Sequence, residues 1–130
     1  MERGMDIGNG GKWSAITRLV FWAALTFTMV MATMPKPPTM FSTPSDKLNH
    51  VIAFFVLTAL HQVAYRDFGF WRRMLMMTTL GGVIELVQMV PSLNRDAEWM
   101  DWLADVVAAF VASCLLSLVM PNKATNRSEP

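Results

Sequence analysis

Three pairs of polar side chains recur at spacings of three or four residues in an otherwise apolar chain. They are Asp46 and His50, Glu85 and Gln88, and Asp101 and Asp105. At these spacings the members of each pair share one face of an α-helix. A histidine close to several carboxylates is suited to general acid–base chemistry, and carboxylates with a neighbouring cation can bind the head group of a ligand.

Two cations accompany these pairs. Lys47 lies within the first pair and Arg95 lies between the second and the third. Lys47 and Arg95 are able to bind a phosphate or a carboxylate, while Glu85 and Asp101 are able to accept hydrogen bonds from the ligand or its amide groups.

Each of these residues also has a purely structural interpretation. Asp46 and Asp101 stand where helix N-caps are expected, and Lys47 and Arg95 are ordinary charges for a membrane interface. Gln88 is able to hydrogen-bond across helices. Such roles would hold helices together without any chemistry.

Glu85 is the residue for which a structural interpretation is least sufficient. An ionised carboxylate facing lipid is costly, and even a neutral one needs a partner. We therefore expect Glu85 to face the interior of a helix bundle, with Lys47, His50 or Arg95 as its partner. Asp105, about one turn into its own helix, likewise needs an interior position and a partner.

Metal and cofactor binding have little support in the sequence. No hydrolase, zinc or phosphate-loop motif occurs, and Cys114 is the single cysteine. A metal would have to use His50, Glu85, Asp101 and Asp105. The sequence-based expectation is no metal and no cofactor.

Composition places these residues in a membrane protein. Of 130 residues 53% are hydrophobic and 16% charged, with a formal net charge of +1, and the mean hydropathy is +0.33. The hydrophobic share and the mean hydropathy exceed what a soluble domain of this length usually shows, and charged residues are few. Because the basic residues are few and dispersed, a nucleic-acid partner is not expected, whereas membrane lipid is.

The predicted fold is all-α, an integral membrane bundle of four transmembrane helices. The expected spans are 16–34, 46–65, 71–90 and 101–120, which form one transmembrane domain over 16–120, between polar tails at 1–15 and 121–130. Prolines make 35–45 an extended loop. Small residues recur on the last span, at Ala104, Ala108 and Ala112, and on the third, at Gly81 and Gly82, which favours close helix packing.

The first span has an alternative interpretation as a cleaved signal peptide. A basic start precedes its apolar run, and Val30-Met31-Ala32 is a passable cleavage site. The run is longer than the usual core of a signal peptide, of about 7–15 residues, so a retained span is preferred.

The distribution of basic residues predicts an orientation. With both termini in the cytoplasm, the three outer basic residues are Lys36, Lys47 and Arg95. The other eight then lie inside: Arg3, Lys12, Arg18, Arg66, Arg72, Arg73, Lys123 and Arg127. This asymmetry favours an N-in, C-in topology, in which all three polar pairs face the outer leaflet. His61 falls near the inner end and is left out of the predicted site.

In order and spacing, the motif Asp46-Lys47-x-x-His50 with Phe54, Glu85-x-x-Gln88, Arg95 and Asp101-x-x-x-Asp105 resembles the VanZ-like membrane proteins, whose founding member confers low-level teicoplanin resistance. The resemblance covers about residues 46–116. Asp105 departs from it where the family has asparagine, and Ala108 and Ala112 where glycine is common. It implies a small multi-pass protein of the bacterial inner membrane, with its motif residues near the outer surface.

Several functions remain open at this stage. The leading hypothesis is a protein that binds, or acts on, a cell-wall precursor or another lipid-linked group at the outer leaflet and so alters susceptibility to glycopeptide-type antibiotics. The alternatives are a membrane enzyme using histidine and carboxylate chemistry, a proton- or ion-coupled device, and an assembly partner without chemistry of its own. Whether the protein is an enzyme is left undecided.

Overall fold

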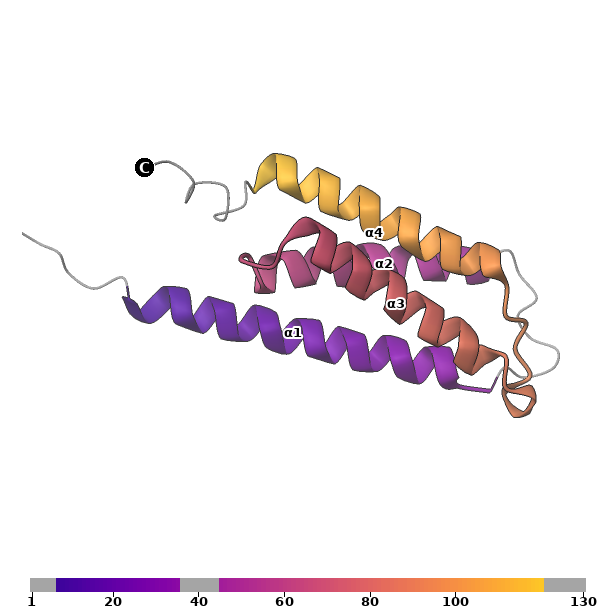
Figure 1. The fold of residues 1–130 in the computed structure, drawn as a ribbon. Coiled ribbons are helices and arrows are strands. Elements are labelled where there is room, and N and C mark those ends of the chain that lie inside the picture. Colours follow the sequence, from indigo (N-terminus) through magenta and orange to yellow (C-terminus); the bar gives the residue numbers. More distant parts are fainter. Residues whose placement is uncertain (1–6, 36–44, 121–130) are drawn as a thin grey trace, which may run out of the picture.

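The computed structural model describes residues 7–35 and 45–120, with the side chains of 11–35 and 47–120. The described chain forms four α-helices and a short 3-10 helix: α1 (Ile7–Thr33), α2 (Ser45–Ala64), α3 (Phe70–Gln88), η1 (Pro91–Leu93) and α4 (Trp99–Val119) (Figure 1). No strand occurs in this part, so the predicted all-α class is confirmed. The tail residues 1–6 and 121–130, and 36–44 of the predicted loop, lie outside the described residues.

Two of the helices are long and apolar enough to cross a membrane. They are α1, over Gly11–Thr33, and α4, over Trp99–Val119. Helix α1 begins at Ile7 and not near residue 16, so residues 7–15 belong to it and not to the predicted tail. Once a helix is nucleated, each added residue gains a hydrogen bond, and no proline precedes Ile16 to stop that extension.

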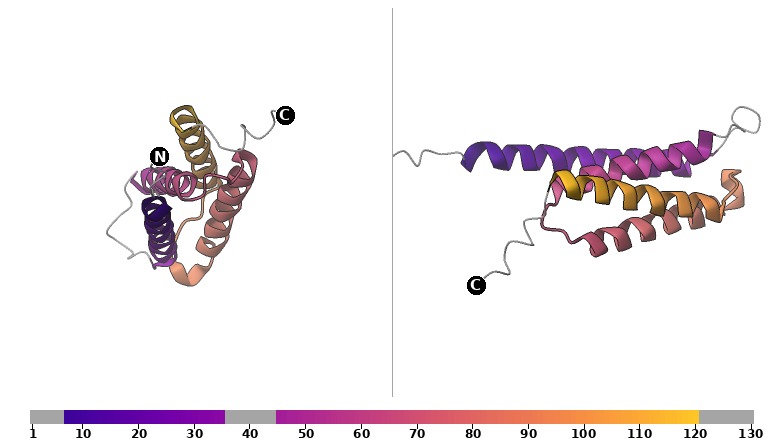
Figure 2. Two further views of the ribbon diagram at one scale, coloured as in Figure 1. Left: turned by 90° about the vertical axis from the view of Figure 1, so that its left-hand side faces the viewer. Right: turned by 90° about the horizontal axis from the view of Figure 1, so that it is seen from above.

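Helices α2 and α4 run in the same direction, and α1 and α3 run opposite to them (Figures 1 and 2). The largest helix interface is that between α2 and α4. Hydrogen bonds at its two ends, from His50 to Asp105 and from Gln62 to Ser117, join residues that are 55 positions apart. Along the whole parallel pair, a residue of α2 therefore lies beside the residue of α4 that is 55 positions later in the sequence.

Large side chains on α2 face small ones on α4. The same offset places Phe54 beside Ala109 and Leu57 beside Ala112, and all four are buried. Small residues on one helix allow the backbones to approach closely and let the large residues of the other fill the space between them.

Helix α3 approaches α4 through a glycine. A Cβ atom on Gly81 would lie 3.0 Å from Asp105 Oδ2 and 3.3 Å from both Asp105 Cβ and Trp102 Cδ1. Trp102 Nε1 also donates a hydrogen bond to the carbonyl of Thr78, 3.0 Å away. The absence of a side chain at Gly81 therefore lets Asp105 enter the bundle.

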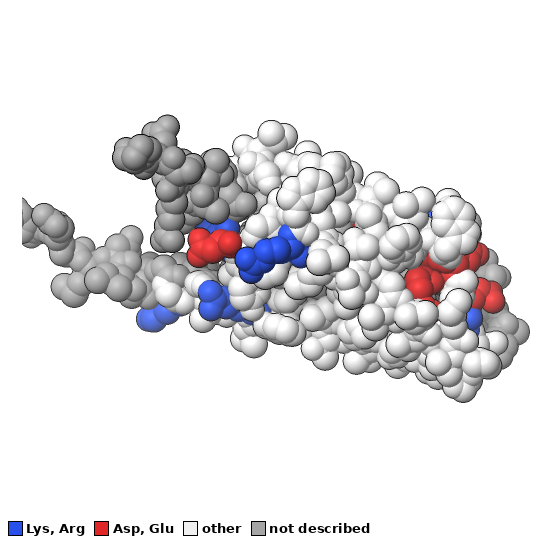
Figure 3. Space-filling model, in the orientation of Figure 1, with Lys and Arg blue, Asp and Glu red and all other residues white. Residues whose placement is uncertain are grey.

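Charge is confined to the two ends of the face shown in Figure 3. Acidic side chains gather at the end where α4 begins, and most of the visible basic side chains lie at the opposite end. Large apolar side chains, among them Leu19, Phe27, Leu86 and Leu118, are exposed along the helices between these ends. The sides of the bundle are thus apolar where those of a soluble bundle would be polar.

A candidate binding site at one end of the bundle

The starts of α2 and α4 and the end of α3 lie at one end of the bundle (Figure 1). Lys47, near the start of α2, forms an ion pair with Asp101 Oδ1, and its Nζ lies 3.2 Å from Glu98 Oε2. Asp101 is buried, whereas Lys47 and Glu98 are partly open to solvent. Lys47 therefore covers the solvent-facing side of the buried Asp101 carboxylate.

His50 and Asp105 form a second contact, one turn deeper. His50 Nδ1 lies 3.1 Å from Asp105 Oδ1 and 3.3 Å from Oδ2, and the aspartate side chain is fully buried. A carboxylate in this position accepts a hydrogen bond from Nδ1–H, and in the neutral ring this leaves the lone pair on Nε2. The pair thus fixes the ring orientation and favours one tautomer.

Glu85, on α3, faces the same space. It is only 9% exposed, and neither of its carboxylate oxygens forms a hydrogen bond to the described residues. The backbone amide of Glu98 is close enough to act on it electrostatically, but does not meet hydrogen-bond geometry. One ligand atom each from His50, Glu85 and Asp101 lies within 4.8 Å of the other two.

Gln88 and Arg95 lie on another side of this end, against the last turn of α1. Gln88 Nε2 donates to the carbonyl of Ala32 at 3.2 Å. Arg95 Nε and Nη2 donate to the carbonyls of Met34 and Met31, at 3.1 and 2.7 Å. These carbonyls have no partners within their own helix, and a cation there also complements the helix dipole. The hydrogen bonds from Gln88 and Arg95 therefore hold the end of α1 against the bundle.

The remaining predicted site residue is Asp46. Its backbone belongs to α2, but its side chain lies outside the described residues. No contact can be assigned to it.

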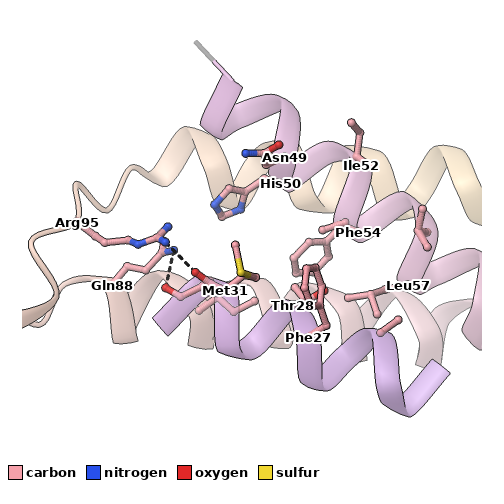
Figure 4. Close-up of a pocket in the computed structure, with 15 residues that line it drawn as sticks. Phe27, Thr28, Met31, Asn49, His50, Ile52, Phe54, Leu57, Gln88 and Arg95 are labelled. Atoms are coloured by element: carbon pink, nitrogen blue, oxygen red, sulfur yellow. Dashed lines mark hydrogen bonds between the residues drawn. The ribbon is translucent and has the colours of Figure 1, made fainter. Parts of the chain in front are cut away.

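A pocket of about 480 Å³ opens between α1 and α2 and reaches α3 (Figure 4). Its walls are mainly apolar, as at Phe27, Phe54 and Leu57. Polar side chains gather at one end of the pocket: Asn49, His50, Gln88 and Arg95. His50 thus borders both the pocket and the carboxylate cluster.

A polar network that the sequence did not predict occupies the other end of the bundle. From the sequence, Arg73 was counted only among the basic residues expected on the cytoplasmic side, but the structure buries it completely in α3. Its guanidinium donates to His61 Nδ1 at 3.2 Å, Gln62 Oε1 at 3.2 Å and the carbonyl of Phe68 at 2.8 Å. These three hydrogen bonds give each guanidinium nitrogen an acceptor, which compensates for removing the cation from water.

A row of positions on α4, buried as far as Ser113, indicated further polar residues. From Asp101 onward, every fourth residue forms one stripe: Asp101, Asp105, Ala109, Ser113 and Ser117. Ser113 is fully buried, and its hydroxyl lacks a hydrogen bond in the described chain, as does that of Thr58. The offset of 55 places Thr58 and Ser113 beside each other, so the α2–α4 interface is polar at several levels.

The arrangement offers two chemical possibilities. The carboxylates and His50 are able to bind a cation or exchange protons, and the adjoining pocket is able to hold an apolar group with a polar head.

No protein-family model, curated protein or solved structure matches this chain.

Proposed function

We propose that this chain is a multi-pass protein of the bacterial inner membrane whose four helices all cross the bilayer, with both termini in the cytoplasm. Support comes from the two helices that are long and apolar enough to span, from the exposed apolar sides, and from the charged ends. Among the described residues, the excess of basic side chains at the end where α1 begins and α4 ends favours this orientation.

The proposed activity is binding of a lipid-linked amphiphile at the outer leaflet. The observation that carries this proposal is the pocket between α1 and α2, with apolar walls and a single polar end. Helices α1 and α2 would hold the hydrocarbon chain by van der Waals contact with the apolar walls, since a lipid chain in the bilayer is already out of water. The polar end would bind the head group.

The head group best suited to this end is a phosphate or another anion. Arg95 donates through Nε and Nη2 to the carbonyls of Met34 and Met31 at the end of α1, and among the described residues its Nη1 is left for a ligand. Asn49 is exposed at the pocket and offers an amide donor. A polyprenyl phosphate or a cell-wall precursor built on one has this combination of chain and charge, which agrees with the VanZ-like resemblance and with an effect on glycopeptide susceptibility.

The test is native mass spectrometry of the detergent-solubilised protein with a long-chain polyprenyl phosphate. Ala24 lines the pocket, whereas its neighbour Ala23 is exposed on the same helix. We expect Ala24→Phe to fill the pocket and weaken binding at least tenfold, and Ala23→Phe to leave it within about twofold, since about 1.4 kcal/mol corresponds to a factor of ten. Equal binding by both variants would reject the pocket as the site.

Two further comparisons test the ligand class and its consequence. The corresponding polyprenol, which lacks the phosphate, should bind the wild-type protein more weakly than the polyprenyl phosphate does. The two ligands should bind Arg95→Ala equally well. In cells, His50→Ala, Glu85→Gln and Asp101→Asn variants present at normal membrane levels should lose any teicoplanin tolerance that the wild type confers. Retained tolerance in all three would favour a role in assembly.

The His50–Asp105 contact favours a second candidate, a membrane enzyme that acts on the bound amphiphile. A histidine oriented by a buried carboxylate is a common general base. In this case a lipid or cell-wall species would change between deletion and wild-type strains, and His50→Ala would reproduce the deletion profile. A protein that only binds would leave these profiles unchanged.

A further inference from the structure

Three helices each contribute one potential ligand at the carboxylate end. His50 comes from α2, Glu85 from α3 and Asp101 from α4, and one ligand atom of each lies within 4.8 Å of the other two. Their separation in sequence means that only the assembled bundle brings them together. We propose that His50, Glu85 and Asp101 bind a divalent transition-metal ion, Mn²⁺ or Zn²⁺.

Glu85 provides an observation that is independent of this clustering. Its side chain is buried, points into the cluster, and has two carboxylate oxygens without hydrogen bonds to the described residues. A buried carboxylate without a partner is costly, and a structure that retains one requires an explanation. A bound cation supplies the missing interaction.

Asp105 has the position of a residue that orients a metal-bound histidine. A histidine that ligates a metal commonly donates its other ring N–H to a carboxylate, which fixes the ring and raises its basicity. The contact from His50 Nδ1 to Asp105 Oδ1, at 3.1 Å, has this form and leaves Nε2 for the metal. Asp105 is therefore a positioning residue and not a ligand in this proposal.

The local charges also favour a dication. Three carboxylates are buried here, those of Glu85, Asp101 and Asp105. Lys47 contacts one of them, at Oδ1 of Asp101, so the other oxygen of this carboxylate can ligate. A divalent ion at the cluster would balance most of the remaining negative charge.

The ligand types narrow the choice of metal. An imidazole suits Zn²⁺ and other transition metals, whereas oxygen-only sites favour Mg²⁺ and Ca²⁺. One nitrogen with two carboxylates suits Mn²⁺ or Zn²⁺. Ligands about 2.0–2.2 Å from Zn²⁺ lie about 3.3–3.6 Å apart, so side-chain shifts of about 1 Å would close the site.

The test uses the full-length protein in detergent micelles, stripped of metal and without added lipid. Binding of Mn²⁺ is measured by electron paramagnetic resonance, binding of Zn²⁺ by calorimetry, and Co²⁺ is added as a spectroscopic probe. We expect one metal ion per protein and a Co²⁺ absorption spectrum that shows nitrogen and oxygen ligands. These wild-type measurements do not depend on any variant folding correctly.

Variants then assign the ligands. Asp105→Asn should weaken metal binding by about 10–100-fold while the Co²⁺ spectrum keeps its form, as expected for a residue that orients a ligand. Glu85→Gln and His50→Ala should weaken binding further and change that spectrum. Glu98→Gln is the matched control, because the Glu98 side chain lies at the same end but contacts Lys47, and it is not among the three proposed ligands.

Two results would overturn the proposal. One is that the wild-type protein binds less than one equivalent of Mn²⁺ and also less than one equivalent of Zn²⁺ at micromolar metal concentration. The other is a Glu85→Gln protein that binds as tightly as Glu98→Gln. Either outcome leaves the amphiphile proposal standing, because the chain-binding walls of that pocket come from α1 and α2 and its test uses no metal.

Discussion

Replacement of Gly81 by alanine tests how tightly α3 and α4 approach around Asp105. The new Cβ would lie 3.0–3.3 Å from Asp105 and Trp102, tighter than nearly all natural Cβ contacts. Asp105 cannot simply rotate away, because its Oδ1 is held by His50. Overpacking of this kind costs about 1–3 kcal/mol, against a gain of about 0.5–1 kcal/mol from replacing a helical glycine.

Gly82→Ala is the matched control, since its Cβ would meet Trp102 at 3.6 Å, an ordinary van der Waals distance. We therefore expect Gly81→Ala to be about 1–3 kcal/mol less stable than Gly82→Ala. The assay is unfolding in mixed micelles with increasing sodium dodecyl sulfate, followed by circular dichroism. If Gly81→Ala proved as stable as its neighbour, the helices could not be packed as described.

Three other substitutions test separate contacts by the same unfolding assay. Arg73→Lys should cost about 1–3 kcal/mol, because the single nitrogen of an ammonium cannot reach three acceptors that bind three different guanidinium nitrogens; an unchanged midpoint would contradict this network. Arg95→Ala should cost about 1 kcal/mol and loosen the end of α1, seen as faster amide exchange near Met31 and Met34; unaltered exchange would argue against that contact. Phe54→Ala should cost about 3–5 kcal/mol by leaving a cavity against α4, and a loss under 1 kcal/mol would disprove its burial.

The helices and the scarcity of their polar residues could be predicted from the sequence, because apolar runs and prolines mark each segment. Spacing within a helix also showed that Asp101 and Asp105 share a face. It could not show that Lys47 contacts Asp101 while His50 contacts Asp105. Those contacts depend on α2 and α4 being adjacent, parallel and offset by about 55 residues, which local patterns do not encode.

Arg73 and Arg95 show a second limit of the sequence. Arg95 was interpreted as an interfacial charge, the usual role of an arginine beside an apolar run, and Arg73 was counted only among the cytoplasmic basic residues. The structure instead gives each a set of backbone or side-chain acceptors. Such acceptors come from distant segments, so the burial of an arginine follows from tertiary packing and not from its neighbours in the chain.

The central claim is that the ends of α2, α3 and α4 that carry the carboxylates meet on the outer side of the membrane. Single cysteines at Asn49, Asp96 and Asp67, in a Cys114→Ser background, test it by labelling of intact cells with an impermeant maleimide. Asn49→Cys and Asp96→Cys should react from outside, and Asp67→Cys only after the membrane is permeabilised. Reaction of Asn49→Cys and Asp96→Cys from opposite sides of the membrane would contradict the topology and the site built on it.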